Sequence, residues 1–382
     1  MRKYLLMATV SLLGACGGGS GGSSSAPNSA GSAAPPAAAQ THSFANPTEA
    51  RTYQTIGGVH SFSYDEDERR QVQTAQLYAG NATTARNSGI TIAYDPRDAI
   101  FQIEINDGPS GVAKSLRYQD PLHRTAFGGA QEPQPGTPNL SQPGISYLQA
   151  GNSSGTPGTA GFTSDVSTFF VQKPGTSTKY VTFAGYVRNT VATTQLTDPT
   201  DQSKYLSNRR VVQRGAFAYG ERTRDQDVPK GGSGTYQGAM IASMVYNPNF
   251  DNDPSSPTFF QWIEGSAQTK LDFGANKFEI NLNGSVQAYQ NFDHYTADFI
   301  TIPAGAAFTA HGAGNIDLLH NGGFLGSFDS ASVGGNALNI AGSSVDGAFY
   351  GPGAAEVGGG FRIVGGVPDQ RVDILGTFVG AK

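Results

Sequence analysis

Strict alternation of apolar and polar residues recurs along most of this 382-residue chain. Segment 90–94 places Ile, Ile and Tyr on one side, and segment 101–105 returns with Phe, Ile and Ile after the turn Asp95-Pro96-Arg97-Asp98. A two-residue period puts alternate side chains on one face of a strand, so the two segments predict a β-hairpin. Segments 169–171 and 180–183 flank Pro174-Gly175 in the same manner, and the alternation returns at 278–283 and 372–378.

The composition agrees with short antiparallel strands. The chain contains 51 glycines, 22 phenylalanines and 16 tyrosines, which favours strands separated by glycine turns over helical bundles. We therefore expect an all-β protein built as a barrel or a sandwich. The polar stretch 65–77 is the exception, because it predicts a short helix.

Shifts in composition suggest two domains after residue 47. Residues 109–160 are rich in Pro, Gly, Ser and Thr and are interpreted as long loops inside a first β-rich domain, 48–228. Residues 222–234 are charged and then glycine-rich, and they mark the end of that domain. The alternation is cleaner in the second domain, 229–382.

The N-terminus predicts secretion and lipidation. Arg2 and Lys3 precede an apolar run over 4–13, and Gly14-Ala15 stand directly before Cys16, the single cysteine. This pattern predicts a signal peptide over 1–15. The sequence Leu13-Gly14-Ala15-Cys16 resembles a lipobox, in which the cysteine is acylated and becomes the new N-terminus. The alternative is an ordinary signal peptide with a cysteine at its cleavage point.

The segment after Cys16 predicts a disordered tether over 16–47. Residues 17–40 are Gly, Ser, Ala, Pro, Asn and Gln alone and bury too little apolar surface to order themselves. Several acyl chains would hold the protein at the membrane permanently. Gly17, by resemblance to bacterial lipoproteins, favours the outer membrane. The net charge of −5 becomes −7 once Arg2 and Lys3 leave, which argues against nucleic-acid binding.

Motifs in the C-terminal half resemble one family of surface lipoproteins. The run Tyr219-Gly220-Glu221, Asp227-Val228-Pro229 and Gly234-Thr235-Tyr236-Gln237-Gly238 is similar to the start of the barrel in the transferrin-binding protein B family. Segment 347–359, GAFYGPGAAEVGG, resembles that family's most recognisable motif, and 376–382 resembles its closing strand. The resemblance covers residues 219–382. It implies a handle-like β domain followed by an eight-stranded antiparallel barrel.

The same resemblance implies a binding function at the outer face of the cell. The family includes receptors for transferrin, lactoferrin, haemoglobin or haem, and complement regulators. For this chain it implies a protein or an iron- or haem-type ligand, a TonB-dependent outer-membrane receptor as partner, and no cofactor. This chain has room for one lobe where the transferrin receptor has two, so the transferrin-binding loops are not carried over. The alternative is an adhesin, or a lipoprotein that recruits host factors without transport.

The residue types in segment 347–359 favour a structural role. The glycines around Phe349-Tyr350 allow a tight bend. Pro352 predicts the first turn of a short helix, and Gly358-Gly359 would leave that helix in a left-handed conformation. We expect Glu356 to cap or pair locally, with a ligand contact as the alternative.

Each candidate motif for catalysis or metal binding is misplaced, interrupted or wrongly spaced. Segment 18–22 matches a nucleophile elbow but lies in the tether. Asp251, Asp253 and Ser255 begin like a calcium loop, which Pro254 and Trp262 interrupt. The spacing of His311, Asp317 and His320 fits no standard metal site, and the remaining histidines are isolated: His42, His60, His123 and His294. We expect no enzyme activity, no catalytic residue and no metal site, and Cys16 is the one site residue assigned.

Aromatic residues and loops are the candidates for ligand contact. A group of aromatic residues lies around an early hairpin of the second domain and is interpreted as core rather than a ligand patch: Tyr236, Tyr246, Phe250, Phe259, Phe260 and Trp262. Segments 247–257 and 109–160 are predicted to be mobile contact loops on a rigid β scaffold.

Cys16→Ser tests the anchor. We expect the variant to lose all fatty-acid labelling and to leave the membrane fraction, because the thiol is the predicted acylation site. Metabolic labelling and fractionation measure both effects. A variant that still sediments with envelopes contradicts lipidation at Cys16.

Overall fold

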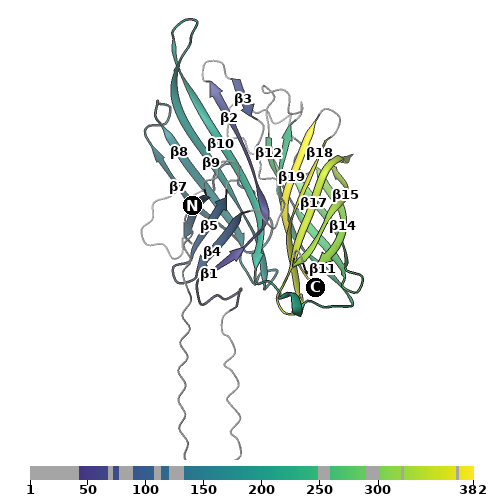
Figure 1. Cartoon of the computed structure of the whole chain (residues 1–382). Helices are drawn as coiled ribbons and strands as arrows, with labels where there is room; N and C mark the ends of the chain where they lie inside the picture. Colours follow the sequence, from purple (N-terminus) through teal and green to yellow (C-terminus); the bar gives the residue numbers. More distant parts are fainter. Residues whose placement is uncertain are drawn as a thin grey trace, which may run out of the picture. The chain divides into compact units, whose positions relative to one another are not determined.

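The computed structural model describes residues 43–67, 72–76, 89–106, 113–119, 133–247, 259–289, 302–319, 322–366 and 370–382. Residues 41–382 form one compact unit. Three antiparallel sheets make up the described chain (Figure 1). A single-turn 3-10 helix, η4 (Asp225–Asp227), accompanies them. Among these residues no helix has the length and apolar character needed to cross a bilayer.

The first sheet, here called the small sheet, contains the hairpin predicted at 90–105. Its order is β1 (Arg51–Gln54), β4 (Ile90–Asp95), β5 (Ile100–Asn106) and β6 (Ala113–Gln119). Ile90 pairs with Ile105, and both are buried. The Arg97 N–H donates to Asp95 Oδ1 at 2.9 Å inside the predicted turn. The alternation thus identified the hairpin correctly.

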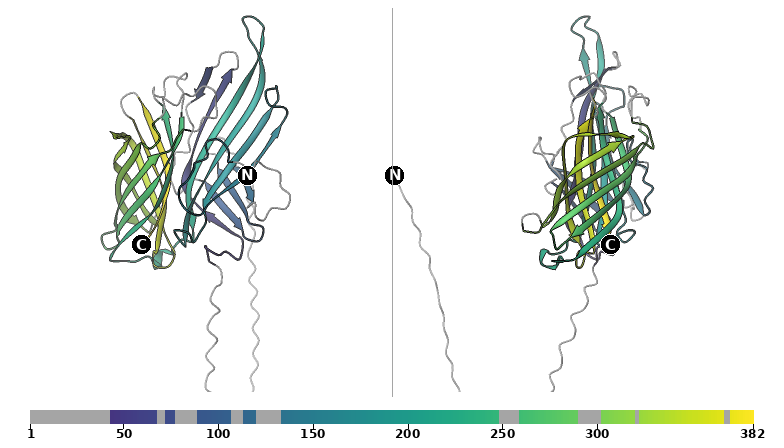
Figure 2. Two further views of the ribbon diagram at one scale, coloured as in Figure 1. Left: turned by 180° about the vertical axis from the view of Figure 1, so that it is seen from behind. Right: turned by 90° about the vertical axis from the view of Figure 1, so that its right-hand side faces the viewer.

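The second, or large, sheet has six strands. Its order is β3 (Val72–Gln76), β2 (Ile56–Asp67), β10 (Lys204–Gly220), β9 (Val181–Thr197), β8 (Thr163–Gln172) and β7 (Ile145–Ser154). The small sheet covers one of its faces, as Figures 1 and 2 show. Phe169, Tyr186 and Phe217 of the large sheet share a buried apolar cluster with Ile92 and Ile103 of the small sheet. Alternation at 169–171 and 180–183 therefore reflects strands β8 and β9.

The helix predicted at 65–77 is wrong. Asp65 and Glu66 lie in β2, which pairs with β10, and residues 72–76 form β3. The charges that resembled a helix surface are partners for the next strand. Arg209 donates to Asp65 at 2.7 Å, and Arg210 donates to Glu66 at 2.6 Å. Cross-strand pairing of opposite charges stabilises this edge as sheet.

The interpretation of 109–160 as loops is wrong in part. The segment contributes β6 to the small sheet and β7 to the large sheet. Strand β7 pairs along its full length with β8, whose residues 167–172 are all buried. A polar strand can form when its neighbour buries most of the apolar surface.

The third sheet closes into the predicted eight-stranded antiparallel barrel. It runs β14 (Ala307–Asp317), β13 (Lys277–Val286), β12 (Phe259–Asp272), β11 (Ser233–Asn247), β19 (Arg371–Ala381), β18 (Glu356–Gly366), β17 (Asn339–Tyr350) and β15 (Gly323–Val333). Pairing of β14 with β15 completes the ring, and the short β16 (Asn336–Ala337) adds to β15. The fold class is all-β, as the sequence predicts.

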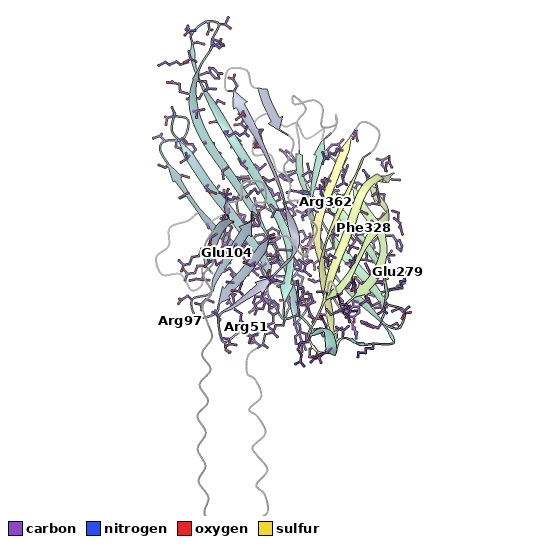
Figure 3. All side chains as sticks on the ribbon, viewed as in Figure 1. Arg51, Arg97, Glu104, Glu279, Phe328 and Arg362 are labelled. Atoms are coloured by element: carbon purple, nitrogen blue, oxygen red, sulfur yellow. The ribbon has the colours of Figure 1, made fainter. Side chains whose placement is uncertain are left out.

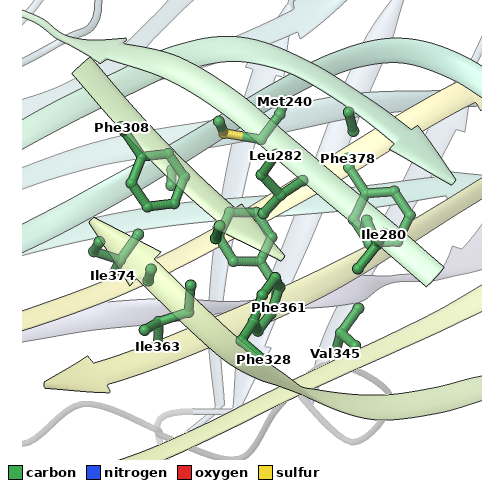
Figure 4. Packing of buried hydrophobic residues seen from close by; sticks show 14 of the residues in the cluster. Met240, Ile280, Leu282, Phe308, Phe328, Val345, Phe361, Ile363, Ile374 and Phe378 are labelled. Carbon is green, nitrogen blue, oxygen red and sulfur yellow. The ribbon is translucent and has the colours of Figure 1, made fainter. Parts of the chain in front are cut away.

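Apolar side chains fill the barrel. Figure 4 shows residues from different strands, such as Met240, Ile280 and Phe378, converging on one core. The Phe324 ring belongs to this core, with its centroid 4.8 Å from that of Phe278 and 5.6 Å from that of Phe349. Barrels of eight strands have an interior just wide enough for side chains. The interior is therefore a packed core, and binding surfaces lie elsewhere.

Phe324→Ala measures the contribution of this core. We expect a loss of about 3–5 kcal/mol in the free energy of unfolding, because the truncation removes apolar burial and leaves a cavity. Leu319 is 93% exposed, and Leu319→Ala should change stability by no more than about 0.5 kcal/mol. Denaturant unfolding gives both values, and equal effects of the two substitutions would contradict a filled interior.

Candidate functional site

The described members of the aromatic group are core residues, as expected. Tyr236 and Tyr246 belong to the barrel interior. Trp262 and Phe260 lie on the outer wall of the barrel, buried against the large sheet. Phe250 and the side chain of Phe259 lie outside the described residues. The buried aromatic side chains leave no exposed aromatic patch at these four positions.

The barrel and the large sheet meet across an apolar contact. The Trp262 ring packs edge-on against Phe170, with centroids 5.5 Å apart, and the Trp262 Nε1–H donates to the Gly136 carbonyl at 2.7 Å. Gly358 on β18 faces Val181 on β9, and a Cβ at Gly358 would lie 2.7 Å from Val181 Cγ2. The two sheets therefore approach too closely at this point for any residue but glycine.

Glu356 joins the two halves through backbone hydrogen bonds. Its carboxylate accepts from the N–H groups of Lys179 at 2.6 Å, Tyr180 at 2.8 Å and Val181 at 3.1 Å. The expectation of a local cap is wrong, since these donors lie about 176 residues away in the chain. The Glu356 side chain is buried, and so is Val181, so the Val181 N–H would lose its partner without gaining water if the carboxylate were removed.

The chain before Glu356 makes a turn rather than the predicted helix. Residues 351–354 form turns, with φ of 71° at Gly351 and 55° at Ala354. The Gly351 N–H donates to the Glu221 carbonyl at 3.0 Å. Gly358 and Gly359 lie inside β18 and do not adopt a left-handed conformation. The motif at 347–359 thus builds the contact between the barrel and the large sheet.

A serine, a histidine and an aspartate meet inside the same contact. His60 Nδ1 lies 2.8 Å from Ser243 Oγ, and His60 Nε2 lies 3.2 Å from Asp373 Oδ1. His60 comes from β2, Ser243 from β11 and Asp373 from β19. The three side chains are 0–1% exposed. Arg362, labelled in Figure 3, donates to both Asp373 oxygens at 3.0 and 2.6 Å.

This set of groups holds the fold together rather than performing catalysis. A serine nucleophile must reach a substrate, and in a Ser–His–Asp triad the histidine meets the serine through Nε2 and the carboxylate through Nδ1. Here no substrate can reach Ser243, and Nδ1 of His60 rather than Nε2 faces the serine. The interpretation of His60 from the sequence as an isolated histidine is wrong. Nothing in its local sequence indicates partners on two distant strands.

The metal candidates do not come together. His311 Nδ1 lies 2.9 Å from Asp329 and is not paired with Asp317. This hydrogen bond holds the pKa of Asp329 below its usual value. His320, Asp251, Asp253 and Ser255 lie outside the described residues. Within the described ranges, no group of three His, Cys, Asp or Glu residues is placed to hold a metal ion.

Part of the predicted mobile loop is fixed against the barrel. Glu264 on β12 accepts hydrogen bonds from the Ser141 N–H at 2.7 Å and the Gln142 N–H at 3.2 Å. Gln287 Nε2 donates to the Asn139 carbonyl at 2.9 Å. Residues 133–144 therefore form a strap, held by side chains of the barrel. Segment 248–257 lies outside the described residues and stays a prediction as a contact loop, as does lipidation at Cys16.

Strands β9 and β10 extend past their neighbours and form a projecting ribbon, visible at the top of Figure 1. The pairing of β9 with β8 ends at Ala192, and the pairing of β10 with β2 ends at Ser207. Among the described residues, 195–197 and 204–206 pair only with one another. We call residues 195–206 the ribbon tip. Leu196 in it is 41% exposed.

Hydrogen bonds order the turn of the ribbon tip. The Asp198 N–H donates to the Ser203 carbonyl at 2.8 Å, and the Thr200 N–H donates to Asp198 Oδ1 at 2.7 Å. Sequence reasoning missed this surface. The Thr-rich segment before Pro199 could have indicated a hairpin. A hairpin pattern does not reveal, however, whether the hairpin extends beyond the strands on either side of it.

Comparison with known proteins gives structural likeness alone. No protein-family model and no curated protein sequence matches the chain. The structure is similar to intact Ap-TbpB with its N and C lobes, at 12% identity and a TM-score of 0.29, covering 88% of this chain and 80% of that chain. It is also similar to a double mutant of transferrin-binding protein B from Haemophilus parasuis Hp5, at 14% identity and a TM-score of 0.28 over 88% of this chain and 77% of that chain.

The isotype 1 transferrin-binding protein B from serogroup B Neisseria meningitidis matches at 14% identity and a TM-score of 0.23, again over 88% and 77% of the two chains. Identities and TM-scores at this level define neither a family nor a ligand for this chain.

Glu356→Ala tests the junction between the two halves. Removal of the carboxylate leaves three N–H donors without their partner, of which the Val181 N–H is buried, and we expect a loss of about 1–3 kcal/mol in stability. Amide hydrogen exchange should accelerate at residues 179–181 more than in the rest of the large sheet. Glu279 is exposed on β13, and Glu279→Ala serves as the matched control. Unchanged exchange at 179–181 would show that Glu356 does not hold this segment.

Proposed function

We propose that this chain is a surface lipoprotein that binds a macromolecular partner at its ribbon tip. A lipid at Cys16 holds it in the outer membrane, and the tether over 16–47 keeps the body away from the lipid. Residues 48–228 act as a handle-like domain and residues 229–382 as the barrel domain, with the boundary between β10 and β11. The projecting ribbon tip carries this proposal.

The support for binding comes from how the ribbon tip is presented. Its root belongs to a six-stranded sheet that packs on both faces, against the small sheet and against the barrel. Arg188 Nε donates to Asp165 Oδ1 at 2.7 Å and fixes β9 to β8 below the tip. A short ordered ribbon on such a base loses little conformational entropy when a partner docks.

The second part of the proposal concerns which partner is bound and which protein receives its cargo. We propose that the partner is a protein that carries iron or haem, and that a TonB-dependent outer-membrane receptor receives the cargo. The resemblance of segments 219–238, 347–359 and 376–382 to transferrin-binding protein B supports this choice. In this proposal the protein is not an enzyme, since the Ser243–His60–Asp373 set is sealed from substrates.

Binding to intact cells tests the ribbon tip. Cells that display the full chain are incubated with haemoglobin, transferrin or lactoferrin, and the retained protein is quantified. We expect at least one of them to be retained, and Leu196→Asp to weaken its binding by about tenfold or more, because a charge replaces an apolar contact.

Leu325→Asp is the control, because Leu325 on β15 has a similar exposure of 38%. It should bind like the wild type. Retention of none of the three proteins contradicts an iron- or haem-protein partner. Equal binding by the Leu196→Asp and wild-type chains places the contact away from the ribbon tip.

A further inference from the structure

A pocket of about 260 Å³ lies between the small sheet and the large sheet. Five of its twelve lining residues are aromatic, from strands β1, β4, β5 and β10 and from the segment that precedes β1. The ring centroids lie 5.3 Å apart for Phe44 and Tyr53, 5.5 Å apart for Phe44 and Tyr219, and 4.5 Å apart for Tyr94 and Phe101. These rings pack against one another and give the pocket an aromatic wall that suits an apolar group.

Two buried phenol groups line this pocket. Tyr219 is 2% exposed and Tyr53 is 9% exposed, and both residues line the pocket. A phenol O–H is a hydrogen-bond donor. The two side chains therefore supply donors at the pocket wall.

Both phenols stay protonated at neutral pH. Burial raises the pKa of Tyr53 to about 12, and the nearby Glu221 carboxylate adds to the effect. Burial raises the pKa of Tyr219 still further, with smaller contributions from Tyr53 and Tyr94. A protonated phenol donates a hydrogen bond, so an acceptor such as a carboxylate suits them.

The pocket lining includes one cation. Lys173 is exposed on the pocket wall and forms no ion pair with any residue that the structure describes. The carboxylates nearby are already engaged, since Arg51 lies 2.7 Å from Glu49 and 3.2 Å from Glu221. The charge left for an incoming group is therefore the Lys173 ammonium.

We propose that this pocket binds a small aromatic carboxylate, with its ring against the aromatic wall and its carboxylate held by Lys173 and the phenol groups. The volume lies just below the ≈300 Å³ at which pockets for drug-sized ligands begin. It suits one ring with a short acidic chain. This site is separate from the ribbon tip and does not rest on the proposed function.

Phenylacetate is the probe for this site. The full-length chain in a nonionic detergent is titrated with phenylacetate by calorimetry, and we expect saturable binding with one site per chain. Acetate lacks the ring and 2-phenylethanol lacks the charge, and each should bind at least about tenfold more weakly. Absence of saturable phenylacetate binding at millimolar concentrations overturns the proposal.

Matched variants locate the site. Tyr219→Phe keeps the ring and removes only the hydroxyl, and Lys173→Gln removes only the charge. We expect each to weaken phenylacetate binding by about tenfold. Lys270→Gln, at an exposed position on β12, should bind like the wild type. If Tyr219→Phe and Lys173→Gln both bind as tightly as the wild type, phenylacetate binds elsewhere on the chain or partitions into the detergent. The assignment of the site is then wrong.

Discussion

The carboxylate of Glu356 accepts three backbone N–H groups from residues 179–181, and the joining of the two halves depends on it. Consecutive N–H groups at the start of a strand would otherwise face the other half of the fold without acceptors. A single carboxylate has enough lone pairs to accept all three. The bend at 351–354 and the absent side chain at Gly358 then have a shared purpose, because they bring β18 close enough for Glu356 to reach β9.

Buried polar groups give the same contact its specificity. Apolar contacts would persist if the barrel slid along the large sheet. The hydrogen bonds of His60 with Ser243 and Asp373, by contrast, form at one relative position of β2, β11 and β19. Asp373 is fully buried, and its charge is matched by Arg362. A buried ion pair contributes little net stability, but a mismatched one is strongly unfavourable. Alternative dockings of barrel and sheet are therefore disfavoured, and the ribbon root is held in one position.

Local patterns in the sequence predicted strands in a barrel or a sandwich, and the family resemblance implied the eight-stranded barrel, but neither indicated the contacts between distant strands. Alternation at 278–283 and 372–378 is a property of neighbouring residues and survives in β13 and β19. The partners of His60 lie 183 and 313 positions away, and no local pattern encodes such distances. The same limit explains the error at 65–77, where charges that pair with Arg209 and Arg210 across strands resembled a polar helix surface.

The anchoring of Phe44 has a mechanical consequence. The predicted tether joins the body just ahead of Phe44, whose ring is 3% exposed among Tyr53 and Tyr219. If the chain is anchored at Cys16 as predicted, tension on the lipid end would act first on this aromatic cluster. It would act next on β1, a four-residue strand that, in the described part of the chain, forms its ladder with β4. Shear at the cell surface would then strain the small sheet before it reached the barrel.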